Sequence, residues 1–144
     1  MDIRYLAGLI DGEGCIGIYR KWKNKHKDAS YVALLVLGMK NQNLLERIRA
    51  EYGGALSRNR VTGAWHLQWQ NEEAMRLVGQ CLPHLIIKRQ LANLCVLFEK
   101  MRAKEQANRP RIGACNFGSY SPFYHQFASY LAAKSKQLIK RQYR

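Results

Sequence analysis

Acidic residues are scarce in this chain of 144 residues, in which Asp and Glu total 10 against 24 Lys and Arg. The formal net charge is therefore +14 at pH 7. An excess of this size in one small chain favours a polyanionic partner, most simply nucleic acid. Ribosomal proteins and membrane-surface proteins share the same excess, so the charge indicates a class of ligand and not an activity.

Long apolar runs are absent as well. The longest, Val32 to Gly38, is far shorter than the roughly 20 residues of a membrane span. Asp11 and Glu13 interrupt the apolar stretch near the N-terminus, which lacks the layout of a signal peptide. Apolar residues still make up 47% of the chain, too many for a disordered protein. We therefore expect a folded protein with no membrane partner, inside a prokaryotic cytoplasm or an organelle.

The cysteines do not form a metal-binding pattern. Cys81 and His84 come nearest to zinc-site spacing, but no second half accompanies them. Disulfides are rare in reducing compartments, so we interpret the cysteines as free thiols that pack as small apolar groups. They are Cys15, Cys81, Cys95 and Cys115.

Hydrophobic spacing predicts the element order α-β-β-α-β-β-α with further helices behind it. The expected helices span residues 4–12, 43–52, 72–82, 86–105 and 122–143, and the expected strands span 15–23, 31–40, 55–60 and 65–70. Asp2 is expected to cap the first helix, and Gly53 and Gly54 to stop the second.

The strands alternate between apolar and polar residues. Ile16 and Ile18 fall on one face of the first strand, and Tyr19 and the lysines fall on the other. In the fourth strand Trp65, Leu67 and Trp69 face one way, opposite His66, Gln68 and Gln70. We expect one α+β domain, in which helices cover one face of a sheet and the other face is polar and basic. Residues 1–105 would form its core, and 106–144 would add a loop and a basic helix to the same domain.

The segment LAGLIDGEG, residues 6–14, carries the chemistry. Its small residues, such as Gly8, let another backbone approach closely. Glu13 follows at the end of the expected helix, where the helix dipole is unfavourable for an anion and a divalent cation would relieve the repulsion. Two such helices side by side would pair two carboxylates, a set that suits Mg²⁺ and two-metal phosphodiester hydrolysis.

This segment resembles the LAGLIDADG motif of homing endonucleases, in the variant that ends in Gly-Glu. The resemblance implies an αββαββα fold whose four-stranded antiparallel sheet forms a saddle on double-stranded DNA. Since only one copy of the motif is present, it implies a homodimer with Ala7, Gly8, Asp11 and Gly12 at the interface. It also implies Glu13 as catalytic residue, and Glu13 with Gly12 as ligands of Mg²⁺. Mn²⁺ is expected to substitute, and Ca²⁺ to support binding without cleavage; no organic cofactor is expected.

Basic and amide side chains supply the expected DNA contacts. Arg58 and Arg60 are two residues apart in the expected third strand, so both would point to one face and read bases or bind phosphate. The first hairpin is rich in lysine, as expected of a tip that follows a DNA backbone. The full expected set is Tyr19, Lys21, Lys23, Lys25, Lys40, Arg58, Arg60, His66, Gln68 and Gln70.

The active-site basic residue has three candidates. In the segment 83–93, aligned on Ala92 and Asn93, the usual lysine of one subgroup falls on Gln90, with Lys88 and Arg89 just before it. We favour Lys88. Met39 stands where such enzymes often place a water-organising Gln, and Lys40 or Gln42 are possible substitutes.

The resemblance therefore predicts a site-specific endonuclease that leaves a staggered double-strand break with 3′ overhangs in a long, nearly palindromic target. The main alternative is a non-cleaving protein on the same scaffold, such as an intron RNA maturase or a DNA-binding regulator. Glu13 favours cleavage, because an acid beside DNA repels phosphates unless it holds a cation. A basic ribosome-associated protein would leave residues 6–14 unexplained.

Overall fold

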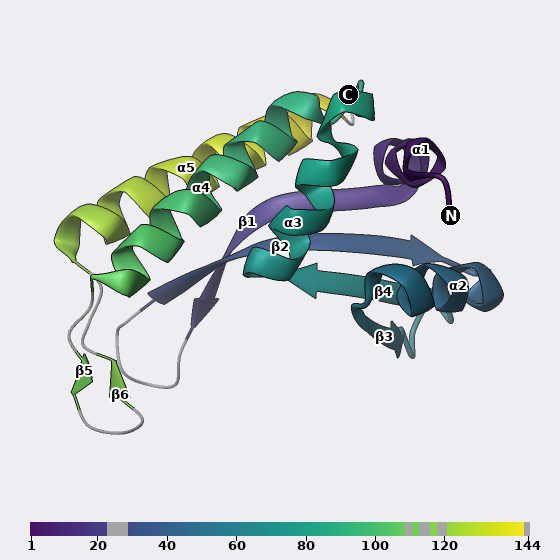
Figure 1. Ribbon diagram of the computed structural model, residues 1–144, viewed down its shortest axis with the longest axis horizontal. Helices are drawn as coiled ribbons and strands as arrows, with labels where there is room; N and C mark the ends of the chain where they lie inside the picture. Colours follow the sequence, from purple (N-terminus) through teal and green to yellow (C-terminus); the bar gives the residue numbers. More distant parts are fainter. Residues whose placement is uncertain (23–28, 109–110, 113–115, 118–120, 143–144) are drawn as a thin grey trace.

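The computed structural model describes residues 1–22, 29–108, 111–112, 116–117 and 121–142. The sequence prediction of αββαββα followed by helices is confirmed (Figure 1). A two-residue pairing of β5 with β6 was not predicted. The elements are α1 (Ile3–Glu13), β1 (Gly14–Trp22), β2 (Ala29–Met39), α2 (Gln42–Tyr52), β3 (Ala55–Arg58), β4 (Trp65–Gln70), α3 (Asn71–Cys81), the 3-10 turn η1 (Leu82–His84), α4 (Arg89–Ala107), β5 (Arg111–Ile112), β6 (Asn116–Phe117) and α5 (Pro122–Gln142).

The first four strands form one antiparallel sheet in the order β1-β2-β4-β3. Its register aligns apolar residues across strands: Leu35 of β2 stands opposite Ile16 of β1 and Trp69 of β4. Paired residues share a face of a sheet, so these three large side chains form one row. All three are fully buried.

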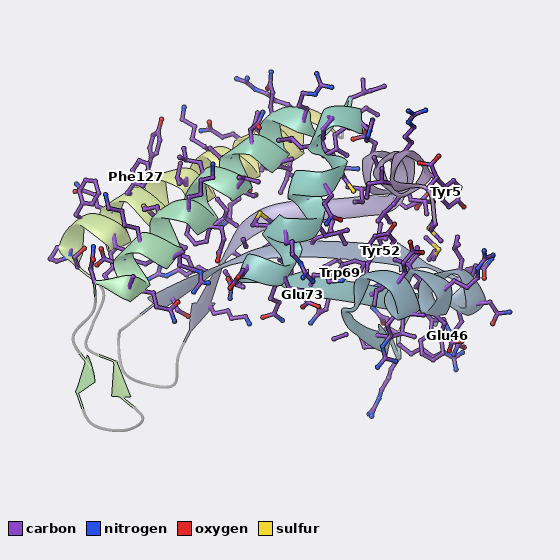
Figure 2. The ribbon with its side chains drawn as sticks, in the orientation of Figure 1. Tyr5, Glu46, Tyr52, Trp69, Glu73 and Phe127 are labelled. Atoms are coloured by element: carbon purple, nitrogen blue, oxygen red, sulfur yellow. The ribbon has the colours of Figure 1, made fainter. Side chains whose placement is uncertain are left out.

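Helices cover one face of this sheet (Figure 1). Every sheet residue in the hydrophobic core comes from the face of Leu35, and it packs there with apolar residues of all five helices. Trp69 belongs to this layer, and its indole Nε1 donates to the backbone carbonyl of Tyr52 at 2.9 Å; both residues are labelled in Figure 2. The opposite face, which we call the open face, therefore carries the alternate residues of each strand.

The β1 edge of the sheet is covered by α5. The backbone N–H of Ile18 donates to the hydroxyl of Ser135 at 3.2 Å, and Ser135 is fully buried. An uncovered edge would expose unpaired backbone groups, and the C-terminal helix supplies a partner for one of them. Among the described residues, no helix is both long and apolar enough to cross a membrane.

The helix caps follow the sequence, with one informative exception. The carboxylate of Asp2 accepts from the N–H of Arg4 at 2.8 Å, as predicted. Gly53 and Gly54 end α2 with φ of +73° and +95°, a conformation that glycine adopts without strain. The prediction that the fourth helix begins at residue 86 is wrong, because α4 begins at Arg89.

Candidate active site and nucleic-acid interface

The C-terminal end of α1 presents an exposed carboxylate. Glu13 is the last residue of the helix, and its side chain is exposed. The chain then turns into β1 at Gly14, where a Cβ atom would lie only 2.6 Å from the carbonyl oxygen of Ile10. Glycine is therefore required there, because backbone atoms cannot move aside as a flexible side chain can. This close turn sets Glu13 at the boundary between α1 and the sheet.

The carboxylate of Asp11 binds another part of the same chain. It accepts from three consecutive backbone N–H groups, those of Ile86 at 2.7 Å, Ile87 at 3.3 Å and Lys88 at 2.9 Å. N–H groups at the start of a helix have no partner within that helix, and here the carboxylate of Asp11 accepts from those just before α4. The bonds explain why α4 starts after Lys88: the carboxylate holds residues 86–88 outside the helix.

Lys88 returns the interaction. Its ammonium Nζ donates to the carbonyl of Ile10 at 2.9 Å and to the carbonyl of Asp11, and the residue is only 3% exposed. Burial lowers the pKa of the Lys88 amine, while the nearby Asp11, Cys15 and Glu13 oppose that shift. The Lys88 ammonium thus binds carbonyls at the C-terminal end of α1, where positive charge is favourable. We call these five hydrogen bonds the Asp11–Lys88 clasp.

The clasp supports Lys88 over the two other candidates for the active-site basic residue. Arg89 turns back to residues 82–88, the segment between α3 and α4 that we call the connector. Its Nε donates to the carbonyl of Leu85 at 2.9 Å. Gln90 is an exposed residue of the first turn of α4. The side chain of Lys88 reaches the last turn of α1, two residues from Glu13. Its backbone is not helical, so an argument from helical spacing between Lys88 and Gln90 does not apply.

One side of α1 has no neighbour among the described residues of the chain. Figure 1 shows the helix nearly end-on at the periphery of the molecule. Tyr5, Gly8 and Gly12 are exposed along it at helical spacing, and a Cβ atom added at either glycine would meet nothing within 4 Å. The prediction for the other two interface residues needs correction. Ala7 is fully buried in its own core, and the carboxylate of Asp11 is bound by its own chain.

The open face of the sheet is polar at its ends and aliphatic at its centre. Lys21 of β1 donates to the side chain of Gln70 on β4 at 2.8 Å across this face. The ring of Tyr19 lies over Gly17, where a Cβ would approach it to 2.9 Å, and its hydroxyl is 3.1 Å from the sulfur of Cys15. The half-buried residues that share the surface at β4 are His66, Gln68 and Gln70.

His66 lies on the open face beside the C-terminal end of β2. It pairs with Gly38, and a Cβ on Gly38 would lie 3.3 Å from the imidazole. Met39 pairs with Trp65 and packs on the core, so its side chain is on the helix-covered face. The imidazole is therefore a polar group on the open face at this level, and sequence comparison at Met39 did not suggest it in that role. Lys40 follows β2 and is exposed.

Two predicted DNA-binding arginines lie elsewhere than expected. β3 ends at Arg58, because the carboxamide of Asn59 accepts from the N–H groups of Val61 and Thr62 and forms a turn. Arg60 is thus in the turn and not in the strand. Arg58 pairs with Trp65, and its guanidinium lies 5.8 Å from the centre of that ring. It shares the helix-covered face and not that of Gln68. Two other predicted contacts, Lys23 and Lys25, lie outside the described residues.

The family follows from comparison with known proteins. A model of the LAGLIDADG endonuclease family matches residues 6–85, more than half of the chain. The chain belongs to the LAGLIDADG endonuclease family. A comparison with curated proteins found no match.

Solved homing endonucleases share this LAGLIDADG fold. I-CvuI bound to the I-CreI target superposes with a TM-score of 0.76 at 21% identity, over 94% of this chain and 80% of I-CvuI. The archaeal intron-encoded I-Vdi141I, complexed with DNA, gives 0.75 at 12% identity over 94% and 82%. I-TnaI gives 0.72 at 13% identity over 99% and 98%. At these identities the likeness establishes the fold, and the coverage extends it past residue 85 into the C-terminal helices.

The donors at the motif end fit a hard divalent cation. The carboxylate of Glu13 and the backbone carbonyls of the last turn of α1 are oxygen ligands, the kind that Mg²⁺ prefers. Among the described residues, no group of three or more His, Cys, Asp or Glu side chains gathers as a metal site. Glu13 and the carbonyls would therefore supply only part of a coordination shell, and other oxygens would complete it.

Proposed function

We propose that this protein is a site-specific DNA endonuclease that acts as a homodimer and requires a divalent cation. The observation that carries the proposal is an exposed carboxylate, Glu13, at the end of a helix whose last turn is anchored by the buried Lys88. Both lie beside a sheet with one uncovered polar face. I-CvuI and I-Vdi141I, which share the fold, are seen in complex with DNA.

The homodimer accounts for the bare side of α1. Gly8 and Gly12 have no role within the chain that requires the absence of a side chain, because an added Cβ meets nothing. A second α1 packed against this side would use the close approach that glycine permits. A two-fold axis there brings two Glu13 carboxylates together, one from each protomer.

Each residue at the motif end then has a distinct role. Glu13 and the carbonyl of Gly12 would hold Mg²⁺, with Mn²⁺ as a substitute and Ca²⁺ supporting binding only. When bound, the cation supplies Lewis-acid activation of water and charge neutralisation at the scissile phosphate. Lys88 has three N–H donors and uses two on carbonyls of α1. The third remains to donate to a phosphate oxygen or to an attacking water.

The dimer fixes the cutting pattern. Two Glu13 residues that lie close to a two-fold axis must act on two phosphates that are also close together. Phosphates of opposite strands approach most closely across the minor groove, which is about 6 Å wide in B-DNA, and such pairs are offset so that cleavage leaves 3′ overhangs. The open faces of the two sheets would then lie in the flanking major grooves, with Gln68 and Gln70 toward the bases.

The test is cleavage of a randomised DNA library in Mg²⁺, with sequencing of the cut ends. We expect staggered breaks with 3′ overhangs, 5′-phosphates and 3′-hydroxyls, centred in a nearly palindromic site. Glu13→Gln should abolish cleavage and retain DNA binding in Ca²⁺, because the amide keeps the shape and loses the charge. Glu46→Gln, on an exposed position of α2, is the matched control. Sequence-specific binding without cleavage in Mg²⁺ or Mn²⁺ would overturn the nuclease proposal.

A further inference from the structure

The carboxylate of Asp11 lies in the motif but is bound by the backbone of its own chain. Both oxygens are engaged, Oδ2 by Ile86 and Ile87 and Oδ1 by Lys88, at 2.7–3.3 Å. A carboxylate used in this way is committed to its own backbone and is a poor candidate for metal or partner binding. Its position in the motif therefore needs another explanation.

The clasp joins two segments that are 75 or more residues apart in the sequence. The side chain of Asp11 binds the backbone of residues 86–88, and the side chain of Lys88 binds the backbone of residues 10 and 11. Each side chain thus fixes the backbone from which the other one projects. Loss of the carboxylate would free the connector, and the amine of Lys88 would no longer be held in a single place.

The connector exposes two large apolar side chains to solvent. Ile86 is 84% exposed and Ile87 is 59% exposed, although both are large apolar residues that usually bury. Packing of their side chains therefore does not hold this turn in place. The three N–H bonds to Asp11 hold it at residues 86–88, while the buried Leu85 and the bonds from Arg89 to the carbonyls of Leu85 and Pro83 hold it just before them.

We propose that Asp11 is the positioning residue of the active site, which sets both the amine of Lys88 and the last turn of α1 that carries Glu13. The inference rests on the proposed nuclease function for its consequence in catalysis, while the contact itself can be tested without it. Groups that orient catalytic residues typically contribute 10–100-fold to activity. Small displacements of a reacting group are enough to produce such losses.

The matched pair for the test is Asp11→Ala and Asp2→Ala. Both remove a carboxylate that accepts from backbone N–H groups at a helix start, and both belong to α1 or its cap. Hydrogen exchange by mass spectrometry is measured first, on the free protein. The amides of residues 86–88 should exchange slowly in the wild type and much faster in Asp11→Ala, and remain protected in Asp2→Ala. Unchanged protection in Asp11→Ala would overturn the inference whether or not the protein cuts DNA.

Single-turnover cleavage is measured second, at a temperature at which each variant is folded by circular dichroism. Asp11→Ala should lower the cleavage rate about 10–100-fold with DNA affinity in Ca²⁺ unchanged, and Asp2→Ala should do neither. Asp11→Asn keeps one carbonyl acceptor and should recover part of the rate. Equal losses in both alanine variants would show a merely structural role. A wild type that never cleaves would refute the proposed function and leave the exchange result to decide the positioning role of Asp11.

Discussion

Two glycines of the same motif should respond to alanine in opposite ways. At Gly8 an added Cβ meets nothing within 4 Å, and alanine is favoured over glycine inside a helix by about 0.8–1.0 kcal/mol. Gly8→Ala should therefore raise the free energy of unfolding of the monomer by about 1 kcal/mol. At Gly14 the Cβ would lie 2.6 Å from the carbonyl oxygen and 2.8 Å from the Cα of Ile10. Gly14→Ala should lower the free energy of unfolding by about 1–3 kcal/mol, the usual range for overpacking.

Self-association of the protein should also distinguish Gly8 from Gly14. The Cβ of Gly8→Leu would likewise meet nothing within 4 Å among the described residues, but the side chain would fill the proposed contact between two α1 helices, so it should block dimerisation while the fold persists. The assays are urea denaturation at several protein concentrations, since dimerisation contributes to apparent stability, and sedimentation velocity at micromolar concentration. A wild type that sediments as a monomer on DNA, or a Gly8→Leu variant that remains a dimer, would refute the reasoning. A Gly14→Ala variant as stable as wild type would refute the close approach at the end of α1.

Three further predictions concern the site, the interface and the core. Lys88→Met should lower single-turnover cleavage by about 100-fold or more with little change in DNA binding. Because burial lowers the pKa of Lys88 below 10.5, the folded protein binds fewer protons there than the unfolded chain does. As the pH falls just below 10.5, protonation of the unfolded chain should therefore lower the stability of the wild type, and Lys88→Met should not show this loss. Gln68→Ala should change base preference at one position in each half-site by about 1–3 kcal/mol, whereas Arg58→Ala, from the other face, should weaken all sequences equally; the reverse pattern in competition binding would mean that the open face is not the reading surface. Burial raises the pKa of Cys81 to about 11 and that of Cys95 to about 12, so stability should fall as pH rises from 9 toward 11, and iodoacetamide should label both thiols far more slowly in the native protein than in urea.

The repeating pattern of the sequence was enough to predict the four strands of the large sheet. Trp65, Leu67 and Trp69 alternate with polar residues at the period of a strand, and the side with Trp69 is the buried one. The capping side chain of Asp2 and the glycine pair after α2 act within a few residues of their own positions. Interactions of that range can be read from local sequence, because the partner is always nearby in the chain.

The third strand shows the limit of that approach. Alternation carried the predicted strand to Arg60, but the carboxamide of Asn59 bonds to the following backbone and ends it at Arg58. Which face Arg58 shares then depends on its pairing with Trp65, that is, on register between two strands. A register is a property of both strands and their turn, so spacing within one strand does not determine it.

The sequence by itself determined the motif, the order of the elements and the position of Glu13 at the end of a helix, because each depends on residues that are close along the chain. It also limited the position of the active-site basic residue to three candidates, Lys88, Arg89 and Gln90. Only the tertiary structure showed the contacts that favour Lys88 and the backbone groups that Asp11 binds, because the partners of these two side chains are 75 or more residues away. The Asp11 carboxylate binds the backbone at Lys88, and the Lys88 amine binds the backbone at Ile10 and Asp11, so no spacing along the chain indicates the contact. The fold creates it by packing the connector against the last turn of α1.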